Sequence, residues 1–145
     1  MSPATLRGGC HCGNITVAFE TAIRPQELSP RACDCSFCRK HGAAYVSDPE
    51  GGLAITVGDR AQLNEYRQGS QSARFLICRA CGVMVAVLFE AEDGLYGAVN
   101  ATCLENAVAL ATPQTVSPQK LGAEDKTRRW KKIWTPRVRM SVSGG

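Results

Sequence analysis

The sequence has no long hydrophobic run, few aromatic side chains (6%) and only two histidines in 145 residues. No stretch approaches the roughly 20 apolar residues of a membrane-spanning helix, and the first residues lack the apolar core of about 7 to 15 residues that a signal peptide needs. We therefore expect a single cytoplasmic domain with no membrane partner. Thiols stay reduced in that compartment, where clustered cysteines are typical of metal sites rather than disulfides.

Positive charge is scarce outside the C-terminal part of the chain. Eight basic and two acidic residues lie between positions 120 and 139, so this segment carries +6 and the rest −2 of the formal net charge of +4. A nucleic-acid-binding domain spreads positive charge over a folded face, so a nucleic-acid partner is not expected. Trp130 and Trp134 have the spacing of an apolar stripe on a helix. We expect the tail to dock through them; a free, anion-binding tail is the alternative.

The apolar pattern indicates strands. Ile15, Val17 and Phe19 alternate with less apolar residues, and further short segments are rich in β-branched or aromatic residues. These segments are 53–57, 74–77, 83–89 and 95–99. Helix is expected only near 104–107 and in the tail, and the proline-containing segment 111–118 is expected to be a loop. The sequence predicts an all-β domain of small antiparallel sheets over residues 1–118, followed by a helical or irregular tail over 119–145.

Eight cysteines are the abundant feature, and seven of them fall into three groups. Structural zinc usually takes four ligands in a tetrahedron, often as two short pairs from loops far apart in sequence. Cys10 with Cys12, and Cys78 with Cys81, fit that description. Gly82 directly follows the second pair, as in a knuckle whose tight turn favours glycine. These four cysteines are predicted to hold a structural zinc.

The remaining group, Cys33, Cys35 and Cys38, supplies three thiols within six residues. Three protein ligands and an open position are the signature of catalytic zinc, because the fourth position must accept water or substrate. The alternative is a second structural site whose fourth ligand is Cys103, His41 or His11. A redox sensor based on this group is a third possibility.

The cysteine pattern resembles that of the glutathione-dependent formaldehyde-activating enzymes, whose domain is shared with centromere protein V. The motifs that carry the resemblance are Gly9-Cys-His-Cys-Gly13, Cys33-Asp-Cys-Ser-Phe-Cys-Arg-Lys-His-Gly42 and Cys78-Arg-Ala-Cys-Gly82. The resemblance covers most of residues 6 to 104. It implies an Mss4-like all-β fold and two zinc ions per chain. In that family the outer cysteine pairs hold the structural zinc, and the middle CxCxxC holds the catalytic one.

The resemblance also implies an activity, the condensation of formaldehyde with glutathione to S-hydroxymethylglutathione by a carbon–sulfur lyase. The cations nearest to the cysteines in sequence are Arg39, Lys40 and Arg79, and we expect them to receive glutathione carboxylates. A zinc-stabilised module that binds a protein or nucleic acid through its basic tail is the alternative from a different class. The sequence does not indicate an oligomeric state.

Overall fold

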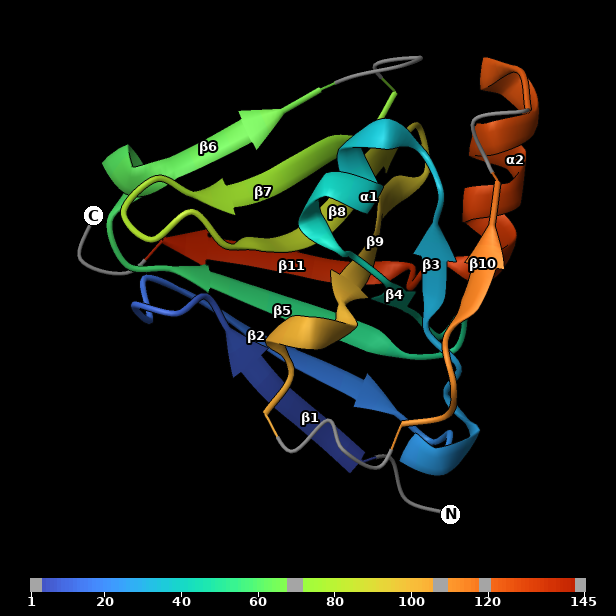
Figure 1. Ribbon diagram of the computed structural model, residues 1–145, viewed down its shortest axis with the longest axis horizontal. Coiled ribbons are helices and arrows are strands. Elements are labelled where there is room, and N and C mark those ends of the chain that lie inside the picture. Colours follow the sequence, from blue (N-terminus) through green and yellow to red (C-terminus); the bar gives the residue numbers. More distant parts are fainter. Residues whose placement is uncertain (1–3, 68–71, 106–109, 118–120, 143–145) are drawn as a thin grey trace.

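The computed structural model describes residues 4–67, 72–105, 110–117 and 121–142 (Figure 1). Its strands form two sheets. The first sheet has the order β1-β2-β5-β11. Its strands are β1 (Ala4–Gly9), β2 (Ile15–Thr21), β5 (Gly52–Val57) and β11 (Arg137–Val142).

The second sheet has seven strands in the order β10-β3-β4-β9-β8-β7-β6. Its strands are β3 (Arg31–Cys33), β4 (Tyr45–Val46), β6 (Leu63–Tyr66), β7 (Arg74–Cys78), β8 (Met84–Ala91), β9 (Gly94–Asn100) and β10 (Gln114–Val116). The α-helices are α1 (Ser36–His41) and α2 (Ala123–Ile133), and short 3₁₀ turns span Pro25–Glu27, Arg60–Gln62 and Ala101–Cys103. The chain is mostly β, in agreement with the predicted all-β, Mss4-like fold. No helix among the described residues is long and apolar enough to cross a bilayer.

Strands with an alternating sequence bury alternate residues. In β2 the side chains of Ile15, Val17 and Phe19 are buried, whereas Thr16 and Glu20 are exposed. This is the pattern of a sheet with one face toward a core. Strand β8 lies inside the seven-stranded sheet and is buried from Met84 to Leu88, which explains its continuous apolar run.

Three local expectations were wrong or incomplete. The expected loop 111–118 contains β10, which pairs in parallel with β3. In the expected helix at 104–107, Leu104 instead forms an isolated β-bridge with Gly8, and 106–107 lie outside the described residues. The middle cysteine segment contains α1, which the sequence analysis did not predict. Pairing with residues far away in sequence decides the first two, so the local pattern could not show them.

The C-terminal segment connects the two sheets. After α2, Thr135 and Gly97 of β9 exchange two backbone hydrogen bonds of 2.9 Å, and β11 then pairs in parallel with β5. A Cβ atom at Gly97 would lie 2.8 Å from Leu88 Cδ2, so glycine permits this close approach. Trp130 and Trp134 are only 9% and 6% exposed. In Figure 1, α2 stands beside β3 and β10, near the middle cysteine group.

Candidate metal centres and the adjoining cavity

The outer cysteine pairs meet where two β-turns come together. Cys10 and Cys12 lie in the connection between β1 and β2, Cys78 is the last residue of β7, and Cys81 lies in the connection between β7 and β8. All four Sγ atoms lie within 4.8 Å of one another. The Sγ atoms of Cys10 and Cys12 are 3.7 Å apart, and those of Cys12 and Cys78 are 3.6 Å apart. The structure thus brings together the four thiols that the spacing had grouped.

This geometry fits a tetrahedral metal with four sulfur ligands. A Zn–S bond of about 2.3 Å gives sulfur–sulfur separations of about 3.8 Å, close to those found here. The backbone N–H of Ile15 points at Cys10 Sγ at 3.3 Å. Gly82, with φ of +81°, closes the second turn by donating to the Cys78 carbonyl at 2.8 Å. The cluster is therefore compatible with a closed metal site.

The middle group lies where β3 passes into α1. Cys33 ends β3, Cys35 is the N-cap of α1, and Cys38 lies inside the helix. The Cys35 sulfur accepts the Cys38 backbone N–H at 3.4 Å, which satisfies one of the free donors at the start of the helix. The three Sγ atoms lie within 4.8 Å of one another. This second cluster is also compatible with a metal ion.

None of the three candidate fourth ligands joins this group. Within the described residues, no further histidine, cysteine or acidic side chain forms part of the cluster. Cys103 is buried elsewhere and donates to the Met84 carbonyl at 3.4 Å. His41 is exposed and packs on Phe37, with ring centroids 4.6 Å apart, and His11 is exposed in the β1–β2 connection. The middle cluster therefore has three protein ligands in this part of the chain.

Tyr45 is a neighbour of the middle cluster that the sequence analysis missed. Its hydroxyl lies 3.1 Å from Cys38 Sγ, and both side chains are buried. A hydrogen bond from Cys38 lowers the pKa of Cys33 to about 6, although burial acts in the opposite direction. The same hydrogen bond and burial raise the pKa of Cys38. The lowered pKa of Cys33 favours its thiolate form, which is the form that binds metal ions.

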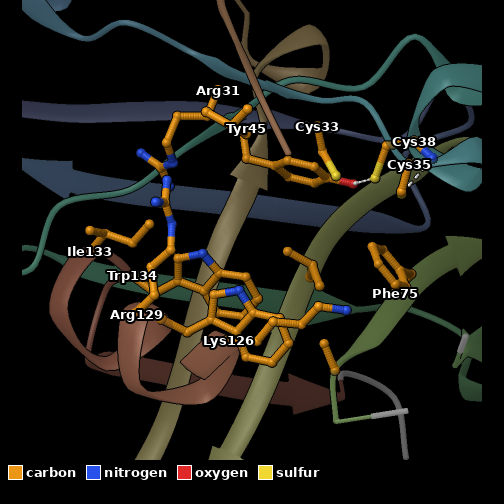
Figure 2. Close-up of a pocket in the computed structure, with 14 residues that line it drawn as sticks. Arg31, Cys33, Cys35, Cys38, Tyr45, Phe75, Lys126, Arg129, Ile133 and Trp134 are labelled. Atoms are coloured by element: carbon orange, nitrogen blue, oxygen red, sulfur yellow. Dashed lines mark hydrogen bonds between the residues drawn. The ribbon is translucent and has the colours of Figure 1, made fainter. Parts of the chain in front are cut away.

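A cavity of about 120 Å³ opens over the three cysteines (Figure 2). Apolar and aromatic residues form most of its wall. They come from β7 (Ala73 just before it and Phe75), β8 (Val87), β10 (Val116) and the C-terminal segment (Trp130, Ile133 and Trp134). The two indole rings are stacked, with centroids 4.7 Å apart. The thiols of the middle cluster therefore face a largely apolar space.

Three cations also line this cavity, namely Arg31, Lys126 and Arg129. Arg31 precedes Cys33 by two positions in β3, so both side chains lie on the same face of the strand. An Arg31 N–H donates to Ser47 Oγ at 2.6 Å. Burial, and secondarily the charge of Arg129, lowers the pKa of Arg31 to about 10, so that it stays protonated at neutral pH. The cavity is consequently positively charged on one side.

The cations that the sequence analysis had chosen lie elsewhere. Arg39 and Lys40 are exposed in the last turn of α1, and Arg79 is exposed in the turn that carries Cys78 and Cys81. None of the three lines the cavity. Their predicted role in binding glutathione carboxylates stays a prediction. The period-two spacing of Arg31 and Cys33 is the signal in the sequence that places a cation beside the cavity.

Comparison with known proteins supports the resemblance in the cysteine motifs. The profile of a family described as "Glutathione-dependent formaldehyde-activating enzyme" matches residues 5–121. A crystal structure of a Rhodobacter sphaeroides protein, solved as a structural genomics target, is similar to this chain, with 26% sequence identity and a TM-score of 0.55. The similarity covers 74% of this chain and 99% of that one. No curated protein matches the chain.

Proposed function

Because the chain belongs to the glutathione-dependent formaldehyde-activating enzyme family, we propose that it is a zinc-dependent carbon–sulfur lyase that joins a small aldehyde to a thiol. At the level of the family the aldehyde is formaldehyde and the thiol is glutathione. In the reaction the thiol sulfur bonds to the carbonyl carbon, the carbon–oxygen double bond becomes single, and the thiol proton is transferred to the oxygen. No oxidant or reductant is needed.

The observation that carries the proposal is the open arrangement of the middle cluster. Cys33, Cys35 and Cys38 converge on one point and line the cavity, and no fourth protein ligand joins them among the described residues. Zinc held there supplies a Lewis-acidic position that lowers the pKa of a bound thiol or polarises a carbonyl oxygen. The four-cysteine cluster has no such opening in its ligand set, and we assign it a structural zinc that ties the β1–β2 and β7–β8 connections together.

The cations of the cavity support the same role. Three thiolates around a divalent ion carry a formal charge of −1, so the approach of a further thiolate is electrostatically unfavourable unless positive groups lie nearby. Arg31, Lys126 and Arg129 line the wall of the same cavity. The apolar remainder of the wall lowers the local polarity and so strengthens these interactions.

The basic tail does not favour the alternative of a separate binding module. Its tryptophans are buried and its strand β11 belongs to the first sheet, so it is not a free polycation.

Exchange between free formaldehyde and its glutathione adduct, measured by two-dimensional exchange NMR, tests the proposal. We expect the zinc-loaded protein to raise the exchange rate in proportion to its concentration, and Cys35→Ser to abolish this increase while the protein stays folded. Cys103→Ser is the matched control, because that thiol lies outside both clusters. Equal rates for wild type and Cys35→Ser would refute the lyase assignment and move the binding module ahead.

A further inference from the structure

The cavity over the middle cluster is built in large part by the C-terminal segment. Five of the residues that line it, Lys126, Arg129, Trp130, Ile133 and Trp134, lie beyond residue 121, where the family match ends. The similar solved structure corresponds over nearly its whole length to only 74% of this chain. The part of the cavity that α2 supplies therefore lies outside the matched family region.

Among the described residues, the three cations of this cavity form no ion pair with a carboxylate. In α2, the neighbouring cations Arg128 and Lys131 pair with Asp125 and Asp93. In contrast, no ion pair joins Arg31, Lys126 or Arg129 to a carboxylate anywhere in residues 4–67, 72–105, 110–117 and 121–142. Figure 2 shows the guanidinium groups of Arg31 and Arg129 close together, on the side of the cavity away from the cysteines. Like charges held together at a half-buried place favour the binding of an anion between them.

The space between these cations and the thiols is apolar. The stacked indoles, Phe75 and Val87 contribute no charge, so a ligand that spans the cavity needs an apolar middle. The amide groups of a tripeptide such as glutathione would find few hydrogen-bonding partners on such a wall.

We propose that the preferred thiol of this protein is a small organic anion, with an apolar chain or ring between its sulfur and one carboxylate or similar acidic group. Arg31 and Arg129 bind the acidic group, the indoles and Phe75 contact the apolar part, and the sulfur reaches the three-cysteine site. The inference rests on the proposed function only for the role of the sulfur. The anion site depends on the cavity alone.

Tryptophan fluorescence provides the test, because Trp130 and Trp134 are the only tryptophans of the chain and both line the cavity. The zinc-loaded full-length protein is titrated with 6-mercaptohexanoate, its neutral counterpart 6-mercaptohexanol, thiol-free hexanoate, and glutathione. We expect 6-mercaptohexanoate to bind about tenfold or more tightly than the alcohol, as one charge-assisted contact implies. It should also bind more tightly than glutathione. Equal affinity for the acid and the alcohol, or tighter binding of glutathione, would overturn the inference.

Variants of α2 locate the anion site. Arg129 is exposed, so Arg129→Gln should fold normally and lose most of the preference for the acid, weakening binding of 6-mercaptohexanoate and hexanoate more than binding of the alcohol. Lys132→Gln is the matched control, because Lys132 is exposed on the same helix and does not line the cavity. An equal loss of the preference for the acid in Arg129→Gln and Lys132→Gln would indicate nonspecific electrostatic attraction and contradict the proposal.

Hexanoate separates this inference from the proposed function. Binding of hexanoate that depends on Arg129, in a protein without formaldehyde exchange activity, would support the anion site and refute the lyase assignment. Exchange activity with glutathione, but no fluorescence response of any variant to hexanoate or 6-mercaptohexanoate, would support the lyase assignment and refute the anion site.

Discussion

The hydroxyl of Tyr45 lies 3.1 Å from the sulfur of Cys38, and only 7% and 2% of these two residues are exposed. Tyr45 belongs to β4, a strand of two residues next to β3, which carries Cys33. The pairing of these short strands thus places a hydroxyl against a metal-binding thiol. Groups that hydrogen-bond to metal ligands hold them in position and adjust their affinity for the metal.

We expect Tyr45→Phe to weaken metal binding at the middle cluster by about 10- to 100-fold, because the variant removes this hydrogen bond and keeps the ring. Competition with a chromophoric chelator measures the affinity. Tyr66→Phe is the control, since Tyr66 is 43% exposed and its ring stacks on Phe37, 5.0 Å away. A similar affinity in all three proteins would show that Tyr45 does not support the cluster.

Substitution at the outer cluster should affect the fold. Cys81→Ser removes one of four ligands that join segments far apart in sequence, and we expect a loss of several kcal/mol in unfolding free energy. Cys103→Ser should cost about 1 kcal/mol, because this thiol makes one weak hydrogen bond to the Met84 carbonyl. Thermal unfolding of the two zinc-loaded variants compares them. Equal melting temperatures would argue against a structural site at Cys10, Cys12, Cys78 and Cys81.

The buried indoles should anchor the C-terminal segment. Trp134→Ala removes a ring that is stacked on Trp130 and belongs to the same hydrophobic cluster as Tyr45 and Phe75, with an expected cost of about 3–5 kcal/mol. Leu121→Ala, at an exposed position just before α2, should cost less than about 0.5 kcal/mol. Urea denaturation provides both values. Similar stabilities would mean that the segment is not held by its tryptophans.

Asp48 should stabilise the fold through its buried carboxylate. The carboxylate accepts from the Thr21 hydroxyl at 2.7 Å and from the Glu50 N–H at 2.9 Å, whereas the backbone N–H of Asp48 donates to Thr135 Oγ1 at 3.0 Å. Asp48→Ala keeps this N–H but leaves the buried Thr21 hydroxyl and the Glu50 N–H without the carboxylate, and we expect a destabilisation of about 2–4 kcal/mol. Asp125→Ala, which removes only an exposed ion pair with Arg128, should cost at most about 1 kcal/mol. Equal losses of unfolding free energy in Asp48→Ala and Asp125→Ala, measured by urea denaturation, would contradict this prediction.

The sequence predicted those parts of the molecule that depend on local patterns. Alternation identified β2, and β-branched content identified β5. The short cysteine spacings identified the three groups of cysteines, because residues two or three apart on a turn stay close in any fold. The tryptophan spacing in the tail indicated a helical stripe, and the structure has α2 there. The division of the chain at residue 118 remains a prediction.

What escaped prediction depends on partners far away in sequence. Strand β11 does alternate, with Val138 and Met140 partly buried between exposed arginines, but its high charge and its distant partner β5 concealed it. Arg31 and Arg129 are almost 100 residues apart in the sequence. They share a cavity only because α2 stands beside β3. The sequence alone therefore could not show which residues form the wall of the cavity opposite the cysteines.

The central claim is that the middle cluster holds a metal with a position open to a thiol, whereas the outer cluster is closed. Cadmium replaces zinc at thiolate sites, and ¹¹³Cd NMR of the substituted protein observes each metal separately through the sulfur ligands around it. The account predicts two resonances, of which Cys35→Ser removes or shifts only one. Addition of 6-mercaptohexanoate should move that same resonance toward the position of a four-sulfur site and leave the other unchanged. A single resonance, or two resonances that do not shift when the thiol is added, would contradict the assignment of an open metal site to the middle cluster.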